Sequence, residues 1–102
     1  KIRFSEILTS EWCRCIDTAK ELNLGQWMTF SGLNSFFQVY EKKDQVMNKL
    51  QKKLDSLGYS DLALLVTHQV VISEQTGIVP RSGEMVLYNS ITKQKARYMI
   101  DY

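Results

Sequence analysis

The sequence predicts an α/β fold, a three-layer αβα sandwich built on a mostly parallel sheet. Two apolar strand-like runs, at residues 7–10 and 61–67, are each followed directly by a helix-like run, and an amphipathic helix over 44–57 lies between them. Strands that alternate with helices are typical of parallel sheets with right-handed crossovers and outer layers of helix. Because the run at 61–67 is continuously apolar, we expect a strand that is buried on both faces.

The other elements follow from helical spacing and turn residues. Ser10 is the expected N-cap of the first helix, since its hydroxyl can accept a hydrogen bond from a first-turn N–H. Gly25 is the expected end of that helix. The helix carries an apolar stripe made of Trp12, Cys15, Ile16, Ala19 and Leu22. The remaining predicted elements are a short strand over 27–30, a loop over 32–39, a short helix over 69–76, and outer strands over 84–88 and 96–102.

Two strand-to-helix junctions carry the residues that point to a function. Ligand sites in open α/β sheets lie outside the carboxyl ends of the strands, and His68 occupies this position after the strand at 61–67. Arg14 lies near the start of the first helix, where a cation opposes the helix dipole unless an anion is bound. A guanidinium and the free N–H groups of a helix start can together hold a phosphate. The sequence therefore predicts an oxyanion site with Arg14 from one junction and His68 from the other.

Both junctions resemble a known family. Ser10, Arg14 and the pair Thr18-Ala19 recur at this spacing in the second conserved block of the histidine phosphatase superfamily, also called phosphoglycerate-mutase-like. The segment that begins at Val66-Thr67-His68 is similar to the C-terminal block of that family; its matching parts are residues 66–72, 76–80 and 82–86. The two blocks come in the family's order, with one helix between them.

The resemblance implies that residues 1–102 are the C-terminal part of a single histidine-phosphatase-like domain that lacks its first strand and helix. It implies that the parent protein hydrolyses phosphomonoesters through a phosphohistidine intermediate, with Arg14 and His68 as catalytic residues that stabilise the transferred phosphoryl oxygens. Arg14, His68 and Ser10 are the implied phosphate-binding residues, and no cofactor or metal is expected. The implied substrate is a phosphorylated small molecule or a phosphoprotein.

The defining element of the family is missing from this chain. In the family, an N-terminal strand ends in Arg-His-Gly, and that His accepts the phosphoryl group. This chain contains no Arg-His-Gly, and its only histidine is His68. We therefore expect the nucleophile to lie outside this chain, and the chain alone to have little or no phosphatase activity.

Two further positions depart from the family pattern. Many relatives have a Glu as general acid near positions 33–37, but Asn34 and Ser35 cannot supply a proton at neutral pH. Glu41 and Asp44 are the acidic candidates in the neighbouring sequence. Gln69 replaces the Gly that often follows the second His, which would change the shape of the pocket wall.

Two other functions remain open. The chain could be a non-catalytic phosphate-binding or interaction module that has lost the nucleophile. This alternative predicts a translation start near Lys1, which is not a Met. An Arg-His-Gly encoded upstream would decide for the enzyme. Alternatively, Lys42, Lys43 and the lysines of the helix over 44–57 could bind a polyanion, but no aromatic residues are interleaved with them, which favours a solvated face.

Two pairs of neighbouring residues have both a structural and a functional interpretation. Cys13 and Cys15 point in different directions on a helix, so we expect no bridge between them. One or both are expected to pack as small hydrophobes, because a metal site would need further ligands. Phe36 and Phe37 either cover one end of the core, which is the favoured interpretation, or line a substrate pocket.

Composition limits the remaining classes. The chain has 102 residues, 44% hydrophobic and 24% charged, as is typical of one globular domain. A net charge of +2 does not favour nucleic acid or membrane as a partner, and no apolar run reaches the ~18 residues of a membrane span. The start lacks a signal peptide, which says nothing about export if residues precede it. A sheet without its central strand would expose edges that invite association, so a homo-oligomer is one partner to expect.

Overall fold

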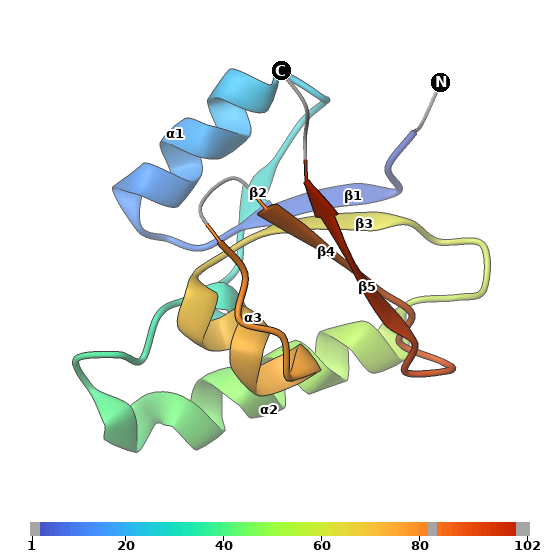
Figure 1. Cartoon of the computed structure of the whole chain (residues 1–102). Coiled ribbons are helices and arrows are strands. Elements are labelled where there is room, and N and C mark those ends of the chain that lie inside the picture. Colours follow the sequence, from blue (N-terminus) through green and yellow to red (C-terminus); the bar gives the residue numbers. More distant parts are fainter. Residues whose placement is uncertain (1–2, 82–83, 100–102) are drawn as a thin grey trace.

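The computed structural model describes residues 3–81 and 84–99, and Figure 1 shows how their helices and strands are arranged. In chain order the elements are β1 (Glu6–Thr9), α1 (Cys13–Leu22), β2 (Met28–Thr29), the 3-10 turns η1 (Ser31–Leu33) and η2 (Tyr40–Lys42), α2 (Lys43–Ser56), β3 (Ala63–Val66), α3 (Gln69–Thr76), β4 (Glu84–Tyr88) and β5 (Lys95–Met99). The predicted strands and helices all occur, with some differences at their ends. Residues 82–83 of the family-like block and 100–102 of the last predicted strand lie outside the described residues.

Three strands form the predicted parallel sheet, in the order β2, β1, β3. β1 pairs with β3 over its whole length, from Glu6 opposite Ala63 to Thr9 opposite Val66, and with β2 at Leu8 and Thr9. The predicted outer strands β4 and β5 pair with each other as an antiparallel ribbon. Among the described residues the ribbon does not pair with the parallel sheet, so the strands form two separate groups.

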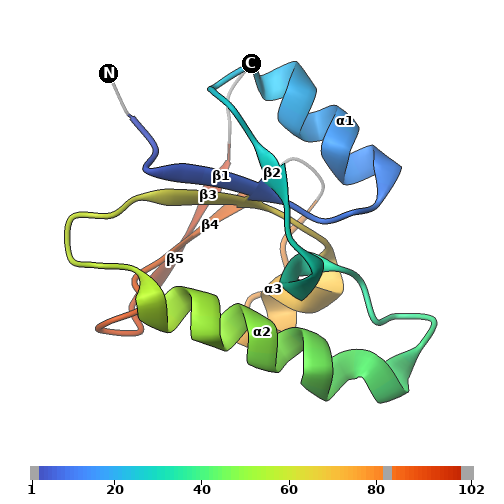
Figure 2. The same ribbon diagram turned by 180° about the vertical axis from the view of Figure 1, so that it is seen from behind.

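Helices cover both faces of the parallel sheet, which gives the domain a layered α/β architecture. α1 lies on one face, and α2 and α3 lie on the other (Figures 1 and 2). The main core forms between the sheet and the helices α2 and α3. Its buried side chains are Leu8, Leu33, Phe36, Val46, Leu50, Leu54 and Val71. The members from α2 repeat at helical spacing and form the predicted apolar face of this helix. Within the described residues, no helix has the length and apolarity to cross a membrane.

Both predicted ends of the first helix are corrected. α1 begins at Cys13, and its N-cap is Trp12 without any side-chain cap, so Ser10 is not the N-cap. The Ser10 hydroxyl instead accepts the N–H of Trp12 at 3.2 Å, in the turn before the helix. α1 is terminated by Asn23, whose backbone is left-handed with φ 49°, rather than by Gly25.

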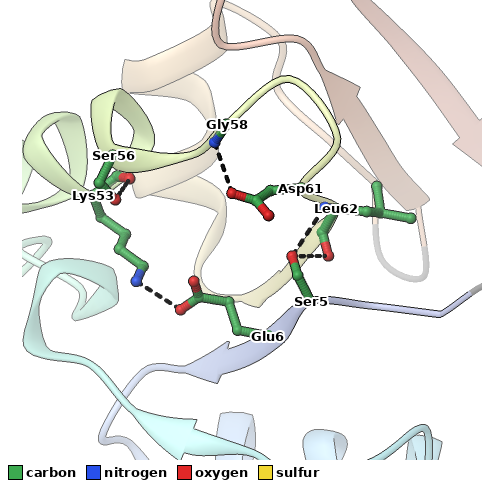
Figure 3. A network of polar contacts seen from close by, with 7 residues as sticks. All are labelled: Ser5, Glu6, Lys53, Ser56, Gly58, Asp61 and Leu62. Atoms are coloured by element: carbon green, nitrogen blue, oxygen red, sulfur yellow. Dashed lines mark hydrogen bonds and ion pairs between the residues drawn. The ribbon is translucent and has the colours of Figure 1, made fainter.

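A polar network joins α2 to the amino ends of β1 and β3 (Figure 3). Lys53 Nζ lies 2.7 Å from Glu6 Oε1. Asp61 Oδ2 accepts a backbone N–H from the turn after α2 at 2.7 Å. Ser5 Oγ donates to the Leu62 carbonyl at 3.0 Å. These contacts hold the end of the sheet that is opposite to His68.

The lysines of α2 are partly engaged by their neighbours. Lys43 Nζ lies 3.2 Å from Glu74 Oε2 on α3. Lys49 Nζ donates to Ser31 Oγ at 2.9 Å, and Lys53 pairs with β1 as described above. These contacts favour a solvated structural face over a free cationic patch.

Candidate functional site

A cleft of about 1770 Å³ lies between β3 and the antiparallel ribbon. All residues of β3 and β4 line it, together with side chains from the three helices. Among the described residues β3 pairs with β1 alone and β4 with β5 alone, so each strand has one edge without a strand partner. The opening also explains why Leu64 is the one buried residue of β3, while the other three are partly exposed. The prediction that this strand is buried on both faces is therefore wrong.

Arg14 and His68 both border this cleft. Arg14 lies in the first turn of α1, which follows β1, and His68 lies between β3 and α3. Because β1 and β3 are adjacent and parallel, their carboxyl ends meet at the same edge of the sheet. Trp12 contacts both residues: its ring centroid is 4.7 Å from that of His68, edge-on, and 5.2 Å from Arg14 Cζ. Two residues from separate junctions therefore share one cleft.

The environment of His68 favours the neutral form of its ring. Burial lowers the pKa of His68 below its ordinary value of 6.5, and the positive charge of Arg14 lowers it further. A bound oxyanion would act in the opposite direction, because its negative charge favours the imidazolium over the neutral ring. The site is therefore cationic through Arg14 and able to gain a second positive charge when an anion enters.

Ser10 supports His68 from inside the protein. It is 0% exposed, and its Oγ lies 2.8 Å from His68 Nε2. The same oxygen donates to Asn34 Oδ1 at 3.1 Å and accepts the Trp12 N–H at 3.2 Å. A hydroxyl has one hydrogen and two lone pairs, so these three contacts satisfy all of them. The Cys15 thiol adds a weaker contact with the same side chain. Ser10 thus contacts the imidazole and not the cleft.

Asn34 holds Ser10 from the segment that follows η1. Its Oδ1 also accepts the backbone N–H of Glu11 at 2.9 Å. Its Nδ2 donates to the Glu11 carboxylate at 2.8 Å. A continuous line of hydrogen bonds therefore runs from Glu11 through Asn34 and Ser10 to His68.

The Cys15 thiol packs against the imidazole ring of His68. Its Sγ lies 3.6 Å from His68 Nε2 and 3.6 Å from the Thr67 carbonyl, to which it donates. Burial raises the pKa of the Cys15 thiol. Cys13 is exposed, and neither cysteine is bridged, in line with the prediction. Within the described ranges, no three His, Cys, Asp or Glu residues gather in a group that could hold a metal ion.

Of the remaining predicted candidates, Phe37 is exposed and lines the cleft, whereas Phe36 is buried in the core. The others serve the fold or lie away from the cleft. Thr67 Oγ1 donates to a carbonyl of η1 at 2.6 Å. Gln69 Nε2 donates to the Pro80 carbonyl at 2.8 Å and so ties the start of α3 to the segment after that helix. Glu41 and Asp44 are exposed near the start of α2, and neither is among the described residues that line the cleft.

The roles of Trp12 and Asn34 around His68 are not predicted from the sequence. Helical spacing assigns Trp12 to the apolar stripe, although its ring also contacts His68 and Arg14. Asn34 lies 24 residues from Ser10 and 23 from Glu11. No local spacing indicates such a contact, so no signal in a single sequence could have found it.

The site thus combines a guanidinium, a buried imidazole and an aromatic ring at the carboxyl edge of a parallel sheet. Comparisons of the chain with models of protein families, with curated proteins and with solved structures find no match.

Proposed function

We propose that this chain forms the phosphate-binding part of a phosphomonoesterase of the histidine phosphatase type. The observation that carries the proposal is that Arg14 and His68 border one cleft beside the carboxyl ends of β1 and β3. Open α/β sheets bind their ligands at such an edge. A guanidinium fork matches two oxygens of a phosphate, and an imidazolium can donate to a third.

In the proposed reaction, a histidine outside this chain attacks the phosphorus of a phosphate monoester. The P–O bond to the alcohol breaks as a P–N bond to the histidine forms, and water then hydrolyses the phosphohistidine to release inorganic phosphate. Negative charge is spread over the three equatorial oxygens during both transfers. Arg14 and His68 would stabilise that charge, which is the electrostatic contribution that often dominates such catalysis.

The open cleft supports the finer part of the proposal, a phosphoglycerate-mutase-like domain without its first strand and helix. A strand placed between β3 and β4 would pair with the free edge of each and would join the sheet and the ribbon. If it ran parallel to β3, it would end beside Arg14 and His68. Apolar side chains from α1 and α2, including Leu22, Leu50 and Leu54, line the cleft and would cover such a strand.

Binding of inorganic phosphate to the 102-residue chain tests the proposal. Trp12 contacts both proposed ligands, so its fluorescence and its indole NMR signal report the titration. We expect Arg14→Ala and His68→Ala each to weaken binding about tenfold to a hundredfold, because each removes a charge-assisted hydrogen bond worth about 1.5–3 kcal/mol. Arg3→Ala is the matched control, since Arg3 is exposed at the opposite end of β1. Equal affinity in all three variants would overturn the proposal.

Hydrolysis of an aryl phosphate tests where the nucleophile lies. We expect no hydrolysis by the purified chain, because His68 is its only histidine and is proposed to be a phosphate ligand rather than the nucleophile. Hydrolysis that disappears in Arg14→Ala would show instead that the chain contains its own nucleophile.

A further inference from the structure

The line of hydrogen bonds from Glu11 to His68 determines where each hydrogen lies. The Asn34 amide is oriented by two partners: its Nδ2 faces the Glu11 carboxylate at 2.8 Å, and its Oδ1 faces the Glu11 N–H at 2.9 Å. The reverse orientation would put a carbonyl oxygen against a carboxylate and an NH₂ group against an N–H. Asn34 Oδ1 is therefore an acceptor.

The acceptor on Asn34 fixes the Ser10 hydroxyl. Ser10 Oγ lies 3.1 Å from Asn34 Oδ1, and only the Ser10 hydrogen can lie between two oxygens that otherwise both accept. Ser10 Oγ has no second hydrogen, so its 2.8 Å contact with His68 Nε2 needs the hydrogen on the ring nitrogen. Ser10 is fully buried and His68 is only 9% exposed, which makes an unmatched pair costly.

We infer that Asn34 is a positioning residue, which acts through Ser10 to keep the proton of neutral His68 on Nε2. The consequence is that binding of an oxyanion is coupled to uptake of a proton at Nδ1. The second half of this inference rests on the proposed function. An oxyanion that accepts from the ring without breaking the Ser10 contact must meet Nδ1. That nitrogen carries no proton until the ring becomes an imidazolium, so one proton is taken up from solvent for each anion that binds in this way.

The other groups around His68 agree with this assignment. Cys15 on α1 donates to the Thr67 carbonyl, so its sulfur is left facing Nε2 as a weak acceptor. Arg14, also on α1, is the cation that acts on the ring. The other charged residues that line the same cleft, among those the structure describes, are Asp61, Arg81, Glu84, Lys93 and Lys95.

Nitrogen NMR of the imidazole tests the first half without any ligand. Because the chain has one histidine, the spectrum contains a single pair of ring nitrogens. In neutral wild-type protein we expect the bonded proton on Nε2. Asn34→Ala frees the Ser10 hydrogen to turn to the ring, so a large fraction of the proton should move to Nδ1. Asn48→Ala, on the exposed face of α2, is the control.

Sulfate binding tests the second half, since sulfate is a tetrahedral dianion that does not titrate near neutral pH. Calorimetry in buffers of different ionisation enthalpy gives the number of protons taken up. Above the pKa of His68 we expect nearly one proton per sulfate for wild type and Asn48→Ala, and distinctly fewer for Asn34→Ala, which already holds a donor at Nδ1.

The outcomes separate this inference from the proposed function. A wild-type proton on Nδ1, or an Asn34→Ala spectrum equal to that of Asn48→Ala, would overturn the positioning role even if sulfate binds through Arg14. Absence of sulfate binding would overturn both the coupling and the proposed function, while the spectra would still decide the tautomer. Should Asn34→Ala fail to fold, Ser10→Ala removes the same constraint on the ring and is read in the same way.

Discussion

Phe36 and Phe37 are adjacent in the sequence and have opposite surroundings. Phe36 is 1% exposed within the core cluster, whereas Phe37 is 78% exposed. Phe36→Ala removes a buried ring and leaves a cavity, so we expect the free energy of unfolding to fall by about 3–5 kcal/mol. Phe37→Ala is the matched control, with an expected change within about 0.5 kcal/mol. Urea unfolding measures both, and comparable losses would contradict the assignment of Phe36 alone to the core.

His68 makes the stability of the fold depend on pH. Its pKa is lowered in the folded protein, first by burial and then by Arg14, so below pH 6.5 the unfolded chain binds the proton more readily than the folded one. The stabilisation from neutral His68 is therefore present above pH 6.5 and is lost as the pH falls through the folded pKa. We expect unfolding midpoints to fall more steeply between pH 7.5 and pH 5 in wild type than in His68→Asn, as urea titrations at each pH would show. Parallel curves for the two proteins would contradict this.

The residues of the site differ in how far the sequence predicts them. Arg14 and His68 are predicted because each stands at a strand-to-helix junction, which is a local pattern. The role of Asn34 is not predicted, because its contacts with Ser10 and Glu11 depend on how η1 packs beside the first junction. A pair of side chains more than twenty residues apart leaves no periodic trace in one sequence.

At the level of elements, the turn between α2 and β3 is closed by a backbone hydrogen bond from Asp61 to the Gly58 carbonyl at 3.1 Å and by one carboxylate. Asp61 Oδ2 accepts the N–H of Gly58 at 2.7 Å and so closes the turn that brings β3 beside β1 (Figure 3). We expect Asp61→Ala to lower the free energy of unfolding by about 1 kcal/mol, the usual contribution of such a hydrogen bond. Asp17→Ala, at an exposed position in α1, should change it by less than about 0.5 kcal/mol. Equal thermal and urea midpoints in the two variants would show that the turn does not need this bond.

The elements themselves are predicted best where a single physical pattern decides them. α3 and β4 have the predicted bounds, and α2 differs by one residue at each end, because helical spacing and turn residues mark them clearly. The start of α1 is predicted wrongly because Ser10, a good N-cap by its chemistry, is held by His68 and Asn34 instead. A tertiary contact has here overridden a local preference.

At the scale of the whole molecule, the separation of the strands into two groups is the feature that local patterns do not give. Alternation of strands and helices predicts the parallel sheet, and the two outer strands are predicted side by side, as β4 and β5 are. Neither prediction states that the outer pair stays unpaired with the parallel sheet. The cleft between the groups follows from that pairing. Unpaired strand edges next to apolar side chains are the features that natural sheets usually cover.

This geometry predicts that the chain associates through the cleft. Leu87 on β4 and Tyr98 on β5 are equally exposed, 54% and 55%, but only Leu87 is among the described residues that line the cleft. A lysine at the cleft would place a charge where a second chain would bring apolar side chains, and edge lysines oppose strand pairing. We therefore expect the mass from sedimentation equilibrium to rise with concentration for wild type and for Tyr98→Lys, and to stay near that of the monomer for Leu87→Lys. If wild type remains monomeric throughout, or if both variants behave alike, the exposed apolar area is tolerated in water and the cleft is not an association surface.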